Sequence, residues 1–335
     1  MLNQLLLVLR LLYKLVPWNA SVVASWLEGG APVRSMTEKQ SQSAILAADA
    51  ASSSGEAIFA AAPLAKMSIE PPKAWVSINF RELWGAREVL YYLTWRDIKV
   101  RYKQSVLGAA WILIQPLLTM VIFSILFGRV AKMPSDGVPY PIFMLSALIP
   151  WNLFSASLSR GPESLVANRQ LLQKVYIPRL LLPLSRILGA SFDFLISLSL
   201  LVVMLVWYRV SPSVHLLYLP LFLVIEMAGT TGAVLWLAAI NVRKRDVERA
   251  LPFLVQVWFY ATPVSYPITI VSNKWRALFG LNPMCGVAEG ARWALLGLKS
   301  SPWSLVATSS VVAFVLLVSG ALFFRKMEQT FADIV

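Results

Sequence analysis

The sequence predicts an all-α polytopic membrane protein with six transmembrane helices, an N-terminal amphipathic interfacial helix and re-entrant helices between spans five and six. Of its 335 residues, 58% are hydrophobic and only 14% are charged, whereas ordinary soluble domains carry about 25% charged residues. The apolar residues form continuous runs, and a helix needs about 20 of them to cross the hydrocarbon core. Continuous runs also exclude a barrel of alternating strands.

Six apolar runs are long enough to be spans. They occupy residues 106–128, 140–159, 180–208, 216–240, 251–270 and 305–324. The sequence therefore predicts a membrane domain over 106–324, an interfacial region over 67–105 before it and a cytoplasmic tail over 325–335.

The distribution of basic residues predicts the orientation. Lysine and arginine are more than twice as frequent on the side that holds the segment before the first span. The positive-inside rule then places both termini in the cytoplasm. The net charge of +13 is explained by this topology, so we expect no nucleic-acid partner.

The segment before the first span is amphipathic when residues 80–104 are placed on a helix. One stripe is aromatic or aliphatic, and it consists of Trp84, Tyr91, Trp95, Ile98 and Tyr102. Beside it lies a basic stripe of Arg96, Lys99 and Lys103. Rings next to cations are typical of a helix at headgroup depth in membrane lipid. The alternative is a short helix packed on another domain, and the chain has no second domain large enough to receive it.

Residues 1–66 lie before the predicted interfacial helix and the predicted spans. Residues 1–16 form a basic amphipathic pattern and residues 44–65 are rich in alanine, so we expect a weakly structured or amphipathic extension. Translation from Met36 or Met67 is an alternative explanation of this region.

The chain lacks the residues that catalysis or ATP binding would need. It has one histidine, His215, and one cysteine, Cys285, which argues against a metal site or a catalytic triad. Glycine is never followed by lysine, so the GxxxxGK phosphate loop is absent. Uphill transport would need energy from a partner or from an ion gradient.

Three ionisable residues fall inside the predicted spans. Arg186 and Asp193 lie seven residues apart on one face of the third span, and Glu226 lies in the fourth. Seven residues correspond to roughly 10 Å along a helix, which is too far for a direct pair. Arg186 lies near the inner end of its span, where it can snorkel to the interface. Asp193 and Glu226 are expected to face the bundle interior, either as part of a polar channel wall or as helix-to-helix hydrogen bonds.

The fifth predicted span is irregular. Pro263 and Pro267 remove backbone donors inside an apolar run. Freed carbonyl groups at membrane depth are tolerated where protein or a water-filled cavity covers them. The following residues 273–301 carry Lys274, Arg276 and Arg292, so we expect short re-entrant helices, capped at Asn282-Pro283, rather than a seventh span.

Five segments in chain order resemble one family. They are WRDIKVRYKQSVLGAAWILIQP (95–116), ALIPWNLFSASL (147–158), NRQLLQKVYIPRLLLPLSRIL (168–188), NVRKRDVERALPFLVQVWFYATPVSYPI (241–268) and LNPMCGVAEGAR (281–292). This set is similar to the polysaccharide-exporting permeases of the ABC type-2 transporters, which carry O-antigen, capsule or teichoic-acid chains. The resemblance extends over residues 80–325.

The resemblance implies an assembly in the bacterial inner membrane. Two copies would form a channel, and two separate ATP-binding-cassette subunits would bind ATP and Mg²⁺, so this chain would need no cofactor and would not be an enzyme. The implied substrate is a lipid-linked polysaccharide. Export of a drug or a lipid, a lipid-linked oligosaccharide flippase not driven by ATP, and a membrane glycosyltransferase are the alternatives.

The resemblance also implies roles for two groups of residues. The connection between spans two and three, residues 163–176, would be a coupling helix that contacts the ATPase through Glu163, Asn168, Leu171, Lys174 and Tyr176; the alternative is a solvated loop. Aromatic rings stack on sugar faces, and the candidates for contact with substrate are Trp111, Trp151, Phe154, Trp258, Phe259, Tyr260 and Tyr266. Packing on lipid or on neighbouring helices is the alternative for each ring. A gate at the outer face is implied near residues 273–301.

Overall fold

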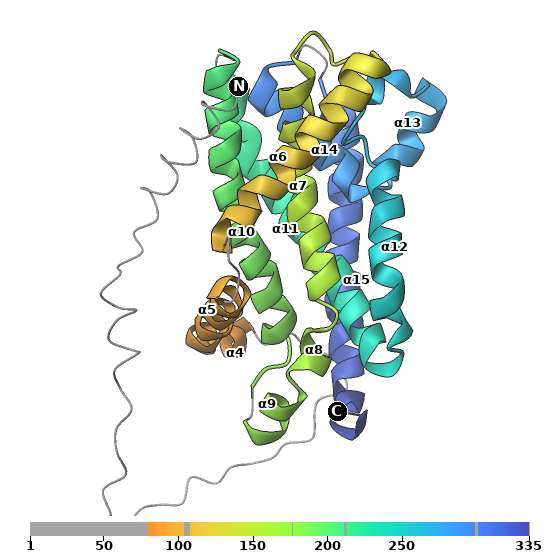
Figure 1. Cartoon of the computed structure of the whole chain (residues 1–335). Coiled ribbons are helices and arrows are strands. Elements are labelled where there is room, and N and C mark those ends of the chain that lie inside the picture. Colours follow the sequence, from red (N-terminus) through yellow and green to blue (C-terminus); the bar gives the residue numbers. More distant parts are fainter. Residues whose placement is uncertain (1–79, 104–107, 176, 211–212, 299–300, 335) are drawn as a thin grey trace, which may run out of the picture. The chain divides into compact units, whose positions relative to one another are not determined.

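The computed structural model describes residues 80–103, 108–175, 177–210, 213–298 and 301–334 (Figure 1). Every element of this part of the chain is a helix, and it contains no strand. The all-helical class is therefore confirmed. The predictions for residues 1–66 and for Tyr176 lie outside the described residues.

Five helical segments are long and apolar enough to cross a membrane. They are Gly108–Val130, Tyr140–Arg160, Leu181–Trp207, Val214–Arg243 and Trp303–Glu328. Each overlaps one of the predicted runs, and only the run over 251–270 has no counterpart among the five. The chain is thus a multi-pass membrane protein.

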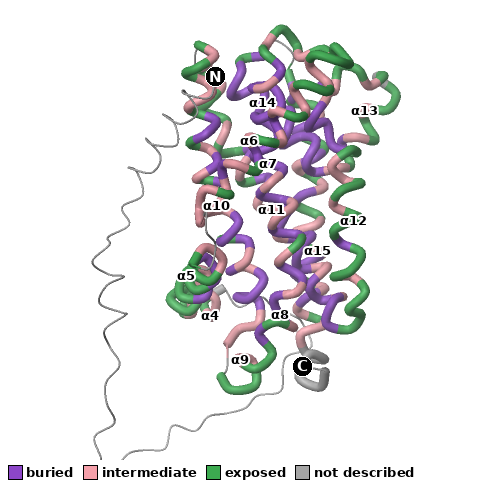
Figure 2. Tube along the Cα trace, viewed as in Figure 1, coloured by how far each residue is buried: buried purple, intermediate pink, exposed green. Residues whose placement is uncertain are grey.

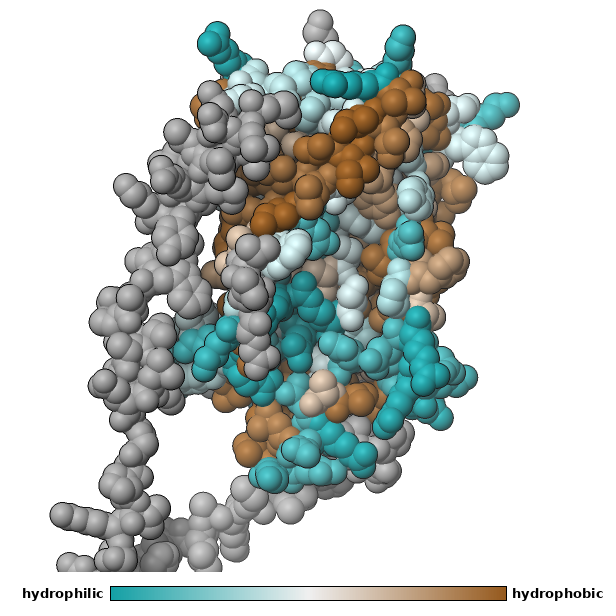
Figure 3. All heavy atoms as spheres, in the orientation of Figure 1, coloured by the Kyte–Doolittle hydropathy of each residue, from teal (hydrophilic) through white to brown (hydrophobic). Residues whose placement is uncertain are grey.

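The first of these segments changes helix type twice along its length. It begins as the 3-10 helix η1 (Gly108–Ala110), continues as α6 (Trp111–Phe123) and ends as the π-helix η2 (Ser124–Val130). Pro116 lies inside α6 and cannot donate its own backbone hydrogen bond. Much of the apolar surface of this segment remains uncovered by the rest of the protein, as the brown band along α6 in Figure 3 illustrates.

The helix α7 (Tyr140–Arg160) lies at the centre of the described bundle and is largely buried (Figure 2). Proline stands in its first turn, where its missing N–H has no helical partner to lose. The helices α6, α10 (Leu181–Trp207), α12 (Asp246–Ala261) and α14 (Pro283–Leu296) all pack on α7. Residues 142–151 of α7 carry no charge and are all buried, as expected for a helix at the centre of a bundle.

The helices α11 (Leu219–Arg243) and α15 (Trp303–Ile334) form the closest helix pair, and the 3-10 turn η3 (Val214–Tyr218) precedes α11. Two glycines allow their backbones to touch. A Cβ atom built at Gly232 would lie 2.3 Å from the carbonyl carbon of Leu316, and one built at Gly320 would lie 2.4 Å from the carbonyl oxygen of Gly232. Small residues commonly permit this approach in membrane helices.

The helix α12 is shorter than the predicted fifth span. It has 16 residues, which correspond to about 24 Å, less than the hydrocarbon thickness. The helix ends at Ala261 because the prolines at 263 and 267 interrupt the chain beyond it. The short helices η4 (Ile268–Ile270) and α13 (Asn273–Gly280) follow, and then α14, whose N-cap is Asn282, as predicted.

Two pairs of short helices lie at the opposite end of the bundle from α13 (Figure 1). The predicted interfacial helix is divided into α4 (Phe80–Gly85) and α5 (Arg87–Lys103). The predicted coupling segment consists of α8 (Ser164–Ala167) and α9 (Arg169–Lys174). Hydrophilic residues gather at this end of the molecule in Figure 3.

Candidate functional site

A polar cavity of about 450 Å³ opens among α5, α6, α7 and α10. Its wall combines charged groups, amides and hydroxyl groups with about as many apolar side chains, among them Trp111, Leu153 and Phe194. The polar residues that line it are Arg101, Tyr102, Gln115, Asn152, Ser155, Ser159, Arg160, Asp193 and Ser197. A polar cavity among membrane helices is costly to form, so we take it as the candidate functional site.

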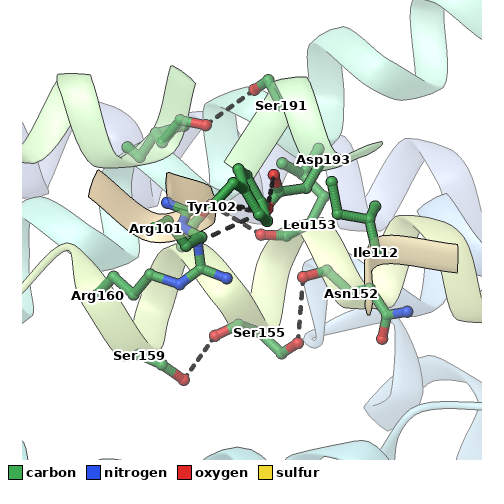
Figure 4. Close-up of polar contacts among 12 residues, drawn as sticks. Arg101, Tyr102, Ile112, Asn152, Leu153, Ser155, Ser159, Arg160, Ser191 and Asp193 are labelled. Atoms are coloured by element: carbon green, nitrogen blue, oxygen red, sulfur yellow. Dashed lines mark hydrogen bonds and ion pairs between the residues drawn. The ribbon is translucent and has the colours of Figure 1, made fainter. Parts of the chain in front are cut away.

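Asp193 is the centre of the polar contacts in this cavity (Figure 4). Its Oδ2 lies 2.5 Å from Nη1 of Arg101 and 3.4 Å from Nη1 of Arg160. The hydroxyl group of Tyr102 donates a hydrogen bond of 2.6 Å to Oδ1. One carboxylate on α10 thus holds both the end of α5 and the end of α7.

Tyr102 is a hydrogen-bond donor throughout the physiological pH range. Burial, followed by the hydrogen bond to Asp193, raises the pKa of Tyr102 to about 12. The phenol therefore keeps its proton and directs it at the carboxylate. Tyr102 had been predicted to lie on the lipid-facing stripe; the structure turns it into the cavity instead.

A second set of charges joins α5 to α10 one turn earlier. Arg186 Nε lies 3.3 Å from Oδ2 of Asp97, and Nη2 of Arg96 lies 2.9 Å from Oδ1 of Asp97. Nη2 of Arg96 also donates a hydrogen bond of 2.8 Å to Oδ1 of Asn168, at the beginning of α9. The interfacial helix therefore contacts the predicted coupling segment directly.

The predicted separation of Arg186 and Asp193 holds, because neither binds the other and each pairs with α5. Sequence reasoning did not find their partners, Asp97 and Arg101. One signal was present. On α5 the acid Asp97 precedes the base Arg101, whereas on α10 the base Arg186 precedes the acid Asp193. When the two helices lie side by side in the same direction, each acid therefore faces a base of the other helix.

The other residues of the predicted interfacial stripe divide along α5. Trp84, Tyr91 and Trp95 are exposed, and the Lys99 ammonium group lies 5.6 Å from the centre of the Trp95 ring. Ile98, in contrast, is buried. The stripe changes from exposed to buried because the second half of α5 packs on α10.

The candidate substrate-binding aromatics are mostly packed against one another. Phe259 lies edge-to-face with Trp151 at 5.6 Å, and Trp258 lies edge-to-face with Phe154 at 5.0 Å. Trp151 and Phe154 are buried, so neither offers a free ring face, and we withdraw these two candidates. Trp258 and Phe259 are partly buried in the same cluster.

Three other aromatic candidates differ from this cluster. Tyr260 is 58% exposed on α12, and Trp111 is exposed beside the cavity that it lines. Tyr266 is half-buried, and its hydroxyl group donates to the carbonyl oxygen of Tyr260. Tyr260 and Trp111 therefore remain the aromatic side chains with accessible faces.

The predicted coupling residues have unequal access to a partner. Lys174 is exposed, Glu163 is half-buried and Asn168 is buried against Arg96. Burial raises the pKa of the Glu163 carboxyl group, and nearby Arg186 opposes that rise. Leu171 packs on the core cluster of its own chain, so the apolar contact surface of α9 is not at Leu171. Val175, which follows α9, is 51% exposed.

Glu226 faces the bundle interior, as predicted. It is buried, and neither carboxylate oxygen has a hydrogen-bond partner in the described part of the chain. It lies near Phe222 and Ala291, away from the polar cavity.

At the other end of the bundle, Arg292 secures the irregular segment after α12. It is 0% exposed and lies 2.9 Å from Glu289. Its guanidinium group also donates to the carbonyl oxygens of Phe143, Val264 and Tyr266. The contacts with Val264 and Tyr266 satisfy carbonyl groups of the irregular segment, and the contact with Phe143 joins that segment to α7. Sequence reasoning had read Arg292 only as a charge that prevents a seventh span.

The fold and the site define a multi-pass helical membrane protein with a partly polar cavity among its helices. Residues 88–296 match the family model described as ABC-2 type transporter, and the chain belongs to this family. The sequence-based recognition of the family is therefore confirmed.

Three known permease and transport proteins are similar to this chain over most of its length. The O-antigen export system permease protein RfbA of Myxococcus xanthus is 32% identical over 256 residues, which are 76% of this chain and 97% of that protein. RfbA of Klebsiella pneumoniae is 28% identical over 74% of this chain and 95% of its own length. The polysialic acid transport protein KpsM of Escherichia coli is 22% identical over 70% of this chain and 91% of its own length.

Proposed function

We propose that the chain is the membrane-spanning subunit of an ATP-driven exporter that moves a lipid-linked polysaccharide across the bacterial inner membrane. The observation that carries this proposal is the match over nearly the whole length of relatives named as O-antigen export permeases. The cavity agrees with it, because amides, hydroxyl groups and charges in its wall suit a polar substrate better than an apolar drug.

The topology that we propose has six spans and both termini in the cytoplasm. α12 would be the short fifth span, and the segment from Thr262 to α14 would complete its passage as a re-entrant structure. Two features support this. Arg292 and the Tyr140 hydroxyl group satisfy carbonyl groups of the irregular segment, and basic residues are concentrated at the end that holds α5 and α9.

The active assembly would contain two copies of this chain and two ATP-binding-cassette subunits, which would hold ATP and Mg²⁺. Support for the second copy comes from uncovered apolar side chains. On α6 they include Leu118 and Ile122, and on α12 they include Phe253, Leu254 and Val257. In a membrane protein such side chains are covered either by lipid or by another helix, and the proposal assigns those of α6 and α12 to the contact with the second copy.

The ATPase subunit would dock on α9. Replacing Val175 by aspartate is expected to reduce both ATPase retention and export, because a charge would be buried in that contact without a partner. The expected loss of docking free energy is about 2 kcal/mol. The measurement is the amount of ATPase subunit that copurifies with the variant, together with the export rate. Val214→Asp, at an exposed valine on η3, is the matched control and should retain the ATPase; normal docking of the Val175 variant would exclude this surface.

Purification of the tagged chain from its host in a mild detergent tests the function as a whole. An ATP-binding-cassette subunit should copurify, and membrane vesicles should accumulate lipid-linked glycan only when ATP is supplied. Absence of the ATPase subunit, or accumulation driven by a proton gradient without ATP, would instead identify a flippase. ATP-dependent movement of a drug or a lipid without glycan would identify a different exporter.

A further inference from the structure

The charges in the cavity wall are not balanced. Among the described lining residues, Arg101 and Arg160 are cationic and Asp193 is the only anion. Asp193 interacts with both guanidinium groups, so one positive charge is left over. An unbalanced charge among membrane helices is unfavourable unless something else compensates it.

The two arginines also have unused hydrogen-bonding capacity. Nη2 of Arg101 is buried near Gly189 of α10 and has no hydrogen-bond partner in the described part of the protein, so the side chain must turn to offer this donor to the cavity. Arg160 makes a single long contact of 3.4 Å with Asp193, although a guanidinium group offers five donors. A buried donor without an acceptor costs free energy, and the cavity of about 450 Å³ beside these groups has room for a ligand.

The rest of the cavity wall favours an anion with several oxygen acceptors. Asn152 contributes an amide, and Ser155 and Ser159 contribute hydroxyl groups, all from α7. No second carboxylate lies among the described lining residues. Guanidinium groups bind tetrahedral oxyanions through paired donors, and the bonds that hold Arg101 are made through its Nη1 atom.

We propose that this cavity binds a phosphate ester group, with Arg160 and Arg101 as its ligands and Asp193 as an internal counter-ion that competes with it. A phosphodiester carries one negative charge and balances the excess charge of the wall. The phosphate belongs either to a lipid-linked glycan or to a bilayer phospholipid. Only the first source rests on the proposed function.

Binding of the phosphate would weaken the hold of α10 on α5. Asp193 holds Arg101 and Tyr102 at the end of α5, immediately before the chain continues into the first span. Donors of Arg101 that turn to the phosphate are no longer available to Asp193. Occupancy of the cavity would thereby loosen the contact between the interfacial helix and the bundle.

The proposal is tested by binding to the full chain purified in a maltoside detergent, which contains no phosphate. The probes are farnesyl diphosphate and phosphatidylglycerol, with farnesol and diacylglycerol as their phosphate-free counterparts, and native mass spectrometry measures the bound fraction. Arg160→Gln should weaken phosphate-probe binding tenfold or more. Asp193→Asn should tighten it, because removal of the competing carboxylate leaves two uncompensated cations.

The opposite expected effects of Arg160→Gln and Asp193→Asn on phosphate binding distinguish a binding site from a purely structural role of these residues. If Asp193 only held helices together, Asp193→Asn would weaken binding or leave it unchanged, and either result would overturn the proposal. Arg129→Gln removes an exposed cation away from the cavity and should change nothing. If Arg160→Gln elutes as an aggregate, Arg160→Lys keeps the charge without the paired donors and should still weaken binding.

The two probes identify the source of the phosphate. Tighter binding of farnesyl diphosphate points to the lipid carrier of a glycan, and tighter binding of phosphatidylglycerol points to the bilayer. Binding of the phosphate-free lipids as strongly as their counterparts would reject the site. The binding assay requires no ATPase subunit. Phosphate binding can therefore be observed even if no ATPase subunit copurifies, and an ATPase subunit can copurify even if no phosphate binds.

Discussion

Replacing Gly232 by valine is expected to prevent α11 and α15 from packing and to reduce the folded yield severely. The Cβ atom alone would lie 2.3 Å from a backbone carbon of Leu316. A backbone atom cannot move aside as a side chain can, so the two helices must separate along their longest contact. Overpacking of ordinary cores costs about 1–3 kcal/mol, and we expect at least the upper end here. The measurement is the thermal midpoint of detergent-purified protein, followed by size-exclusion chromatography.

Gly229 provides the control on the same helix, three residues earlier. A Cβ atom there would lie 3.4 Å from Ala313 and Pro283, which is ordinary contact. Gly229→Ala should therefore leave the midpoint within a few degrees of the native value, because the ordinary contact costs little and alanine favours a helix over glycine by about 1 kcal/mol. Equal midpoints for Gly232→Val and Gly229→Ala would contradict the close approach of α11 and α15.

The spans were predictable because lipid imposes a simple composition on them. Residues 140–159 and 305–324 carry no charge, and the helices found there begin close to the predicted limits, although α15 continues to Ile334. The end of α12 was predictable for a local reason as well, since Pro263 and Pro267 cannot continue a regular helix. These features depend only on neighbouring residues.

The contacts of α5 depend on how two helices cross, and a helical stripe does not contain that information. Tyr91 and Tyr102 occupy the same stripe, yet Tyr91 is exposed and Tyr102 reaches Asp193. The polar contacts of α5 with α10 come from its second half, through Asp97, Arg101 and Tyr102. The same limit applies to Leu171, which the sequence presents as an apolar knob and the fold turns toward its own core.

Partners that are distant in sequence explain the remaining differences. The aromatic residues of 151–154 and 258–259 were compatible with a sugar-binding surface or with mutual packing. In the structure these rings pack against one another, because α7 contacts α12. Arg292 and the carbonyl group of Phe143 are 149 residues apart, and no local pattern predicts that bond.

Arg292→Ala should cause the second large effect, because this side chain holds three backbone segments together. Its guanidinium group binds Glu289 at 2.9 Å and the carbonyl oxygens of Phe143 at 3.3 Å and Tyr266 at 3.2 Å. Removal takes away the guanidinium donor from the carbonyl groups and leaves the buried Glu289 carboxylate without its counter-ion, with only the amide of Ile268 still donating to it. Loss of one partner from a buried ion pair costs about 3–5 kcal/mol. A large fall in the thermal midpoint and in the amount of protein in the membrane is therefore expected.

Further variants separate the ion pair from the carbonyl contacts. The double variant Glu289→Gln with Arg292→Ala removes the stranded charge, so it should recover part of the lost midpoint but not all of it, since the freed carbonyl groups of the segment after α12 still lack donors. Arg129→Ala, at an exposed arginine, should retain the native midpoint. A double variant no more stable than Arg292→Ala would mean that the carbonyl contacts alone stabilise this region. A single variant with a native midpoint would show that the irregular segment is held by Tyr140 and Asn282, through their bonds to Ser265 and Thr262.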